Sequence, residues 1–316
     1  MQNAIRTPHQ TTAYQAGIFQ PIPMIGRYVF FQLAPAADAA SLKASLTRMK
    51  SLVDGESVVA GIGQQLADRL GVNVPGLREF PALSGPQDVR VPSTPAALLL
   101  WLRGSDMGEL VNRTRALANL LRPALDISNI VDSFRHGPLD KAHAHDLTGY
   151  EDGTENPEGE EAQAAAFAHG QGPLLDGSSF LAIQQWQHDF EQFESFSASD
   201  RDDLMGRRLS DNEELEDAPE SAHVKRTAQE SFEPEAFVLR RSMPWLHSSK
   251  GLDRSGLMFA AFGCSLGAFE VQMRRMAGLE DGIVDGLFRF SQPLTGSYLW
   301  CPPMHNGQLQ LGQLGL

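Results

Sequence analysis

The residues best suited to chemistry lie in a short glycine-containing segment at positions 149–157, Gly-Tyr-Glu-Asp-Gly-Thr-Glu-Asn-Pro. Glycine permits positive φ angles and close backbone approach, and proline prevents a helix or strand from continuing. The segment therefore predicts a tight, irregular loop that holds the carboxylate of Asp152 in a fixed direction. Because Asp-Gly and Asn-Pro pairs are also common in ordinary turns, a plain surface turn stays open as an alternative.

Two segments further along the chain supply a histidine and an arginine. His223 lies in Ser-Ala-His-Val-Lys-Arg-Thr, and Arg240 lies at the end of the apolar run in Phe-Val-Leu-Arg-Arg-Ser-Met-Pro-Trp. An imidazole can bind a metal, and a guanidinium stays charged and offers a planar fork of donors. A lone histidine is also common as a structural residue, so the order of the segments has to carry the argument.

That order is similar to the order found in one enzyme family. A Gly-x-x-Asp-Gly loop, then a lone histidine, then an arginine seventeen positions later resembles the dye-decolourising peroxidases, and within them the bacterial, cytoplasmic branch. Met-Gly-Arg at positions 205–207 and Asp-Gly-Leu-Phe-Arg-Phe at positions 285–290 extend the resemblance over most of the chain. The resemblance implies a haem b peroxidase that reduces hydrogen peroxide and oxidises a bulky organic donor, such as a dye or phenol, or Mn(II).

The resemblance also implies roles for residues on the two faces of the haem. His223 is the expected axial ligand of the haem iron, and Asp285 the expected acceptor for its other ring nitrogen, which makes the imidazole more basic. A carboxylate between apolar neighbours can instead cap a helix, so capping is the alternative for Asp285. On the opposite face, Asp152 is expected to move the peroxide proton and Arg240 to stabilise the developing charge.

Neighbouring residues compete for two further roles. Adjacent side chains of a strand face opposite ways, so only one of Arg240 and Arg241 can enter the pocket. The family register selects Arg240 and places Ser242 on the same face as a second cofactor-binding group. Arg207 is by resemblance the partner of the haem propionates, and Arg208 is its rival.

Apolar residues are expected to form the walls of the haem pocket and to carry electrons. Residues 257–262 and the pair Phe288 and Phe290 suit the walls, with ordinary core packing as the alternative. Because Asp152 and Arg240 should be enclosed, large donors should give up electrons at the surface. The aromatic relay candidates are Tyr150, Trp186, Trp245, Tyr298 and Trp300.

Composition and charge restrict the partners of this 316-residue chain. Its formal net charge of −13 argues against nucleic acid and anionic membranes, which would need a basic face. It shows neither a signal-peptide pattern nor a run of about eighteen apolar residues. Cys264 and Cys301 form no Cys-x-x-Cys motif, so iron–sulfur, structural zinc and covalent c-type haem are not predicted. We expect a cytoplasmic homo-oligomer that binds neither membrane nor nucleic acid.

Alternating β-rich and amphipathic segments predict an α+β fold. Strands are expected at residues 24–33, 56–62, 96–103, 125–136, 180–186 and 257–264, and helices at 38–52, 106–121, 189–196, 199–209 and 269–276. Ser199 is the expected cap of its helix, and residues 75–95 are expected to be a long surface connection. The resemblance implies two ferredoxin-like halves, residues 1–148 and a haem-binding half 149–306, each an antiparallel sheet with helices packed on it, as in the dimeric α+β barrel superfamily.

The last ten residues, 307–316, form a separate C-terminal tail in this scheme. Leucines alternate with glutamines around a glycine there, and an extended peptide that docks into a groove needs such regularly placed anchors. The spacing is similar to the cargo-loading peptides by which some peroxidases of this family enter encapsulin shells. A tail that packs on its own domain or on a neighbouring subunit is the alternative.

Two other classes of function stay open at this point. A haem-binding or haem-handling (iron-release) protein with incidental peroxidase activity would use the same residues. A non-haem metal protein would use the acidic residues 151–161, or the pair His143 and His145, although no third ligand at helical spacing supports zinc. The remaining histidines, His188 among them, show no evident partner, and the acidic run 211–220 is expected to be solvated.

Overall fold

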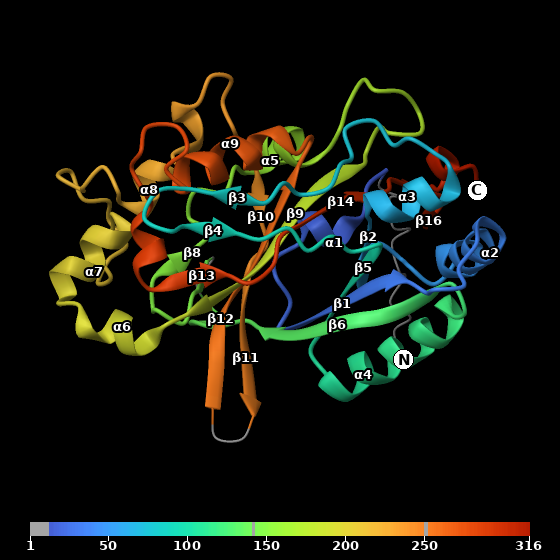
Figure 1. The fold of residues 1–316 in the computed structure, drawn as a ribbon, viewed down its shortest axis with the longest axis horizontal. Coiled ribbons are helices and arrows are strands. Elements are labelled where there is room, and N and C mark those ends of the chain that lie inside the picture. The colour runs from blue at the N-terminus through green and yellow to red at the C-terminus, as the bar shows by residue number, and fades with distance from the viewer. Residues whose placement is uncertain (1–12, 141–142, 250–251) are drawn as a thin grey trace, which may run out of the picture.

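The computed structural model of the protein describes residues 13–140, 143–249 and 252–316. Its main feature is one antiparallel sheet that closes on itself (Figure 1). The strand order is β10-β12-β11-β6-β1-β5-β2-β14-β9-β13, and an additional pairing of β12 with β9 closes the ring between them. The seams are thin, because β14 meets β2 only at Trp300 and Ile62, and β11 meets β6 only at Trp245 and Ser133.

The first half of the chain supplies four neighbouring strands of this barrel. They are β1 (Ile25–Leu33), β2 (Val58–Ile62), β5 (Leu98–Gly104) and β6 (Leu125–Phe134), in the order β6-β1-β5-β2. Helices α2 (Ala39–Lys50) and α4 (Met107–Leu121) follow β1 and β5. Asp38 and Asp106 cap these helices by accepting hydrogen bonds from backbone N–H groups three residues on. This β-α-β-β-α-β arrangement is ferredoxin-like, as expected.

The second half repeats the arrangement with longer insertions. Its strands β9 (Ser179–His188), β11 (Met243–Ser249), β12 (Leu252–Gly263) and β14 (Ser297–Cys301) have the order β11-β12-β9-β14. The short strand β10 (Leu239–Arg240) pairs with β12 along the same edge as β11. Helix α9 (Gly267–Met276) follows β12. The β11–β12 hairpin projects from the body of the molecule (Figure 1). The predicted α+β fold class is therefore confirmed, while the division at residue 148 stays a prediction.

Shorter elements connect these strands. The remaining helices and helical turns are α1 (Ala16–Phe19), α3 (Gln64–Leu70), α5 (Gly159–Ala166), α6 (Phe190–Ser195), α7 (Ala198–Met205), α8 (His223–Arg226), η1 (Gln229–Ser231), η2 (Gly286–Arg289) and η3 (Gly312–Leu314). The remaining strands are β3 (Leu83–Ser84), β4 (Arg90–Val91), β7 (Ala144–His145), β8 (Glu151–Asp152), β13 (Ser291–Pro293), β15 (Met304–His305) and β16 (Gln308–Leu309).

Two local predictions need correction. The cap of helix α7 is Ser197, two residues before the expected Ser199. The Ser197 hydroxyl accepts from the Asp200 N–H at 3.1 Å, and the Asp200 carboxylate accepts from the Ser197 N–H. The connection at residues 75–95 is also not wholly irregular, since β3 and β4 pair within it. Both differences arise from short-range hydrogen bonds that a periodicity argument does not see.

Several barrel strands are buried on both faces over most of their length, which explains their nearly continuous apolar sequences; they are β1, β2, β5, β9 and β14. Along β1, Tyr28 and Phe30 belong to one core cluster with Trp101, while Val29 and Phe31 belong to a second cluster beneath the helices. Alternate side chains of a strand point to opposite faces, so the first cluster fills the barrel and the second packs outside it.

The C-terminal tail packs on its own domain, which corrects the expectation of an appended peptide. Leu309, Leu311 and Leu314 are each 0% exposed and belong to the outer core cluster. Strand β16 pairs with β15, and the Gln313 side chain donates to the Asn73 carbonyl at 2.9 Å. The regular leucines therefore serve as core anchors in this chain.

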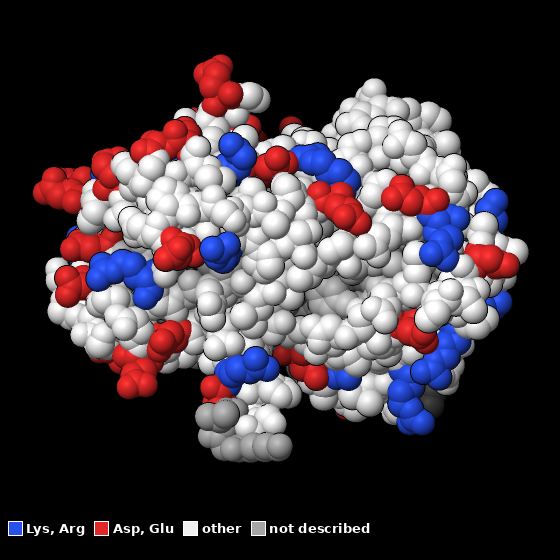
Figure 2. Space-filling view, in the orientation of Figure 1, with Lys and Arg blue, Asp and Glu red and all other residues white. Residues whose placement is uncertain are grey.

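Acidic side chains gather over the part of the surface formed by α6, α7 and the loop after them (Figure 2). The run 211–220 lies there and is mostly exposed, as expected, with Glu213 and Glu214 paired to Arg208 and Arg207. Within the described ranges, no helix has both the length and the apolar character needed to cross a membrane.

Candidate active site

A cavity lies on the outer face of the C-terminal half, between strands β9 and β12 and helices α8 and α9. Its apolar walls come from Trp186, Leu257, Phe259, Phe269, Met273, Met276 and Leu287. Its polar groups include Asp152, Arg240 and His223, which lie far apart in sequence. The structure therefore brings three of the predicted site residues to one apolar chamber.

His223 reaches this cavity from the first position of the short helix α8. Its Nδ1 lies 2.8 Å from Oδ2 of Asp285, whose side chain is fully buried. The other carboxylate oxygen of Asp285 accepts from the Leu287 N–H at 2.8 Å and caps η2. Both interpretations of Asp285 thus hold together, since one oxygen caps the turn and the other holds the imidazole. The remaining ring nitrogen, Nε2, is left for a ligand in the cavity.

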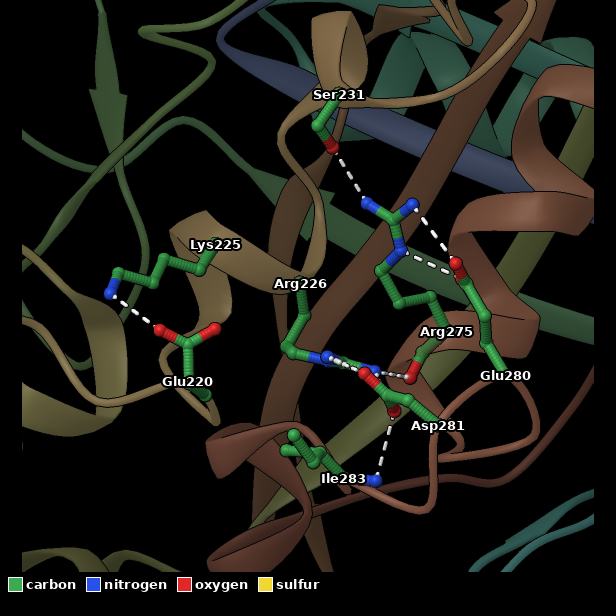
Figure 3. Close-up of polar contacts among 8 residues, drawn as sticks. All are labelled: Glu220, Lys225, Arg226, Ser231, Arg275, Glu280, Asp281 and Ile283. Carbon is green, nitrogen blue, oxygen red and sulfur yellow. Dashed lines mark hydrogen bonds and ion pairs between the residues drawn. The ribbon is translucent and has the colours of Figure 1, made fainter.

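A buried arginine fixes the end of the helix that begins at His223 (Figure 3). Arg226 donates to both carboxylate oxygens of Asp281, at 2.7 and 2.8 Å, and to the Arg275 carbonyl at 2.7 Å. The hydrogen bond from Arg226 is the main cause that lowers the pKa of Asp281 to about 2. Because Asp281 lies four residues before Asp285, these contacts hold α8 and the Asp285 turn in one unit.

Asp152 and Arg240 meet at another edge of the cavity, and one asparagine joins the elements that carry them. Asn156 accepts from the Arg240 N–H at 2.7 Å through Oδ1 and donates to the Arg240 carbonyl at 3.1 Å through Nδ2. The 149–157 segment is therefore bound to strand β10 and is more than a simple turn. Gly149 and Gly153 have φ angles of 93° and 91°, which only glycine adopts without strain.

The carboxylate of Asp152 is held in surroundings that favour its protonated form. Burial raises its pKa above the ordinary value and Asp146 adds to this effect, whereas the charges of Arg240 and His223 oppose it. Such competition between burial and a nearby cation is typical of a group that gains and loses a proton during a reaction.

The neighbours of Arg240 point elsewhere. Arg241 donates to the carbonyls of Ile18 and Phe19 at 3.0 and 2.7 Å, so it ties down the N-terminal segment, and only Arg240 lines the cavity. Ser242 is buried, and its hydroxyl accepts from the Ala260 N–H at 3.5 Å. It lines a second, more open cleft, which also contains Asp152 and Arg240. Asp152 and Arg240 therefore separate the cavity from a cleft at the surface.

Arg207 is not among the residues that line the cavity. Its guanidinium pairs with the carboxylates of Glu155 and Glu214, and it donates to the Asn212 carbonyl at 2.9 Å. Arg208 pairs with Asp211 and Glu213. The sequence could not reveal this competition, because the carboxylates reach Arg207 from two different loops.

Three residues that the sequence left unassigned form a second polar edge of the cavity. His188 lies there with Nε2 3.2 Å from Asp146 Oδ1 and Nδ1 2.7 Å from the Ser291 hydroxyl. Burial would raise the pKa of Asp146, but His188 and Thr148 together hold it at about 2. No local signal joins the three positions, which lie just after β7, at the end of β9 and at the start of β13.

The expected wall and relay residues are only partly at the cavity. Leu257 and Phe259 line it, whereas Phe290 packs in a separate cluster with Tyr150, Phe193 and Leu204. Among the relay candidates, Trp186 lines the cavity and lies 5.3 Å from the Phe288 ring, centroid to centroid. The described residues contain no group of three or more His, Cys, Asp or Glu side chains able to hold a metal ion, so the non-haem metal site at 151–161 is not supported.

Comparison with known proteins decides the family. Residues 143–306 match the family described as Dyp-type peroxidase, C-terminal. The chain is 30% identical over 256 residues to a dye-decolorizing peroxidase of Brevibacterium linens. This match covers 79% of this chain and 67% of that protein. This chain belongs to the Dyp-type peroxidase family. Its activity is accordingly that of a peroxidase, as the order of motifs predicted.

Other relatives of this Dyp-type peroxidase agree. A dye-decolorizing peroxidase of Rhodococcus erythropolis is 29% identical over 254 residues, covering 78% of this chain and 72% of that protein. A Rhodococcus jostii RHA1 DypB variant in complex with heme matches with a TM-score of 0.76 and 25% identity, over 90% of this chain and 94% of that one. An encapsulated DyP-type peroxidase from Mycobacterium smegmatis has the same fold, with a TM-score of 0.78 and 23% identity over 93% and 96% of the two chains.

Proposed function

We propose that this Dyp-type peroxidase binds haem b in the cavity between β9, β12, α8 and α9, with His223 as the axial ligand of the iron. The observation that carries the proposal is the pair of His223 Nδ1 and the buried Asp285 Oδ2, 2.8 Å apart, at the edge of an apolar cavity. A metal-bound histidine typically donates its other ring N–H to a carboxylate in this way.

The residues present fit a haem group. The walls are apolar and aromatic, which suits the porphyrin, and one imidazole nitrogen faces the chamber. On the opposite side, Arg240 Nε is buried without a hydrogen-bond partner among the described residues, so its donor is available to a bound group. A heme complex of a Rhodococcus jostii relative with the same fold supports this choice of cofactor.

Haem, when bound, would supply the iron that reduces peroxide and then oxidises the donor. The chain supplies the acid–base groups and the charge around it. We assign Asp152 as the group that takes a proton from the near oxygen of peroxide and returns it to the far one, because it lies in the cavity with a raised pKa. Arg240 stabilises the negative charge that develops as the O–O bond breaks, and Asn156 fixes its backbone.

The roles of the remaining predicted residues follow from their contacts. Asp285 raises the basicity of His223 and fixes the direction of its ring. Ser242 lies in the second cleft beside Asp152 and Arg240, and we assign it to the entrance for peroxide. The guanidinium of Arg207 is already paired with Glu155 and Glu214, so a propionate bound there would compete with these two carboxylates. Electrons from dyes, phenols or Mn(II) enter from the surface, with Trp186 as the relay nearest the cavity.

Haem binding through His223 is tested by absorption spectroscopy of His223→Ala, with His305→Ala as a matched control because His305 is exposed on β15. The parent and the control should show a ferric Soret band and react with equimolar peroxide. His223→Ala should lose most of its haem and regain the band when imidazole is added. An unchanged Soret band in His223→Ala would show that the axial ligand is a different residue.

A cytoplasmic location, a homo-oligomeric state and packaging in an encapsulin shell stay predictions. A Mycobacterium smegmatis relative with the same fold is encapsulated. In this chain, however, Leu309, Leu311 and Leu314 would have to leave their own core to bind a shell, and each fully buried leucine contributes about 1.5–3 kcal/mol. Cargo loading therefore requires release of the tail.

Deletion of residues 307–316, with co-expression of a candidate shell protein, tests the packaging prediction. Retained haem together with loss of co-purification would support a cargo peptide. Lowered thermal stability or lost haem, with encapsulation unaffected, would make the tail a structural element of this domain only.

A further inference from the structure

A buried polar cluster lies at the cavity, which two of its members line. It consists of Asp146, Thr148, His188 and Ser291. Asp146 Oδ2 accepts from the Thr148 N–H and hydroxyl at 2.9 and 2.6 Å, Oδ1 faces His188 Nε2, and His188 Nδ1 faces the Ser291 hydroxyl. The side chains of His188 and Asp146 are only 7% and 13% exposed. Every polar atom of the imidazole is thus engaged, in a chain with a carboxylate at one end and a hydroxyl at the other.

The hydroxyl end of this chain connects the cavity with the surface. Ser291 lines the cavity and also two surface clefts, one beside Asp189 and Arg289 and one beside Asp88. His188 lines both the cavity and the first of these clefts. Ser291 lines both clefts and His188 lines the first, so a proton that arrives in either cleft can reach the Ser291–His188 pair.

The carboxylate end lies near the peroxide side of the site. In the β7–β8 hairpin, Ala144 pairs with Asp152, so Asp146 and Asp152 point to the same face of the hairpin. Asp146 is close enough for its negative charge to raise the pKa of Asp152. A change of charge in the cluster is therefore felt at Asp152.

The peroxidase reaction has a proton requirement that this edge of the cavity can meet. Reduction of one hydrogen peroxide to two water molecules consumes two electrons and two protons. A donor oxidised at the surface sends electrons through packed aromatic side chains, but its protons stay in solution. A cavity with mostly apolar walls then needs a hydrogen-bonded route for protons that is separate from the route for electrons.

We propose that His188, held between Asp146 and Ser291, is a proton-transfer residue that supplies protons from the surface clefts to the peroxidase site. The imidazolium of His188 gives its Nδ1 proton to the Ser291 oxygen as the Ser291 hydroxyl passes its own proton into the cavity. To restore the imidazolium, a proton then moves from a cleft through the same Ser291 hydroxyl to His188 Nδ1. Asp146 stays anionic throughout and stabilises the charged ring.

The charged groups that face this route lie in the cavity and at the two clefts. Inside, they are Asp146, Asp152, Arg240 and His223. At the mouth of the first cleft they are Asp189, Glu191, Asp253 and Arg289, and at the second cleft they are Asp88, Arg90, Asp285 and Arg289. The excess of carboxylates at the mouth favours an approaching proton. The inference rests on the proposed function, because only a peroxidase with a surface donor creates this demand.

The test uses the holoenzyme, hydrogen peroxide and ferrocyanide, a donor that supplies electrons without protons. His188→Gln keeps hydrogen-bonding groups but cannot carry the proton, Ser291→Ala interrupts the link to the clefts, and His305→Gln is the exposed control. We expect both site variants to oxidise ferrocyanide about tenfold more slowly or worse, with a pH indicator showing delayed proton uptake. The initial Soret change with peroxide should be unaffected, and added imidazole should restore the rate of His188→Gln.

A second measurement does not depend on haem. In the haem-free protein, ¹⁵N NMR of the His188 ring should detect both its neutral and its protonated form. A ring fixed in one state, or parent rates and an unchanged pH profile in both site variants, would overturn the inference while leaving the peroxidase intact. A parent holoenzyme that is inert to peroxide would instead refute the proposed function, and with it this inference.

Discussion

Asp281→Asn should loosen the short helix that presents His223 to the cavity. Arg226 on that helix is only 5% exposed in its side chain, and its two hydrogen bonds to Asp281 are charge-assisted and nearly parallel (Figure 3). The substitution keeps one oxygen acceptor but removes the negative charge. Arg226 then stays buried with incomplete compensation, while its bond to the Arg275 carbonyl persists.

The magnitude follows from the pKa of Asp281, which falls from 3.8 to about 2. A shift of one pKa unit corresponds to about 1.4 kcal/mol, which gives an upper limit of about 2.5 kcal/mol. Because the Asp281 side chain is 40% exposed, solvent screening reduces this to about 1 kcal/mol. If all of this free energy is lost from the positioning of His223, haem affinity should drop about fivefold.

Urea unfolding of the haem-free protein and haem transfer to excess apomyoglobin measure these two effects. A matched control is Glu280→Gln, since the neighbouring Arg275–Glu280 pair is more exposed and should change stability by less than about 0.5 kcal/mol. A group whose folded-state pKa is depressed stabilises the protein above its unfolded-state pKa. The difference between parent and Asp281→Asn should therefore be full at neutral pH and vanish as the pH falls from about 4 through about 2. Equal effects of the two substitutions, or a pH-independent difference, would refute the reasoning.

Three further substitutions address the two faces of the haem site. Asp285→Asn should retain haem and raise its reduction potential, measured by spectroelectrochemistry, because a neutral partner donates less electron density through the imidazole; an unmoved potential would leave Asp285 with its capping role alone. Arg240→Leu should slow the reaction with peroxide by about 10²–10³ in stopped-flow measurements. The acid limb of the pH–rate profile of this variant should also move to higher pH, since Arg240 opposes the raised pKa of Asp152. A parent-like rate and profile would contradict both assignments. Asn156→Ala should slow the same step less than Arg240→Leu does, because it frees only the backbone of Arg240, and an equal or absent effect would argue against that positioning role.

Local patterns in the sequence were sufficient to predict the fold class and the main residues of the cavity. Apolar periodicity and caps such as Asp38 depend on contacts within a few residues, so they can be read from the chain directly. The order of Asp152, His223 and Arg240 identified the family before any contact was known. Alternation also separated Arg240 from Arg241 correctly, because neighbouring side chains of an extended segment must diverge.

Contacts between distant segments were decided only by the tertiary structure. The same leucine spacing fits a docking peptide or a core anchor, and closure of the barrel beside the tail buries Leu311 in this chain. Arg207 has the position expected of a propionate partner, yet Glu155 from the 149–157 loop and Glu214 from its own loop reach its guanidinium. His188 showed no partner in the sequence, since Asp146, just after β7, and Ser291, on β13, meet it only in the folded chain. Long-range pairing of polar groups depends on where whole strands come to lie, and no local pattern records it.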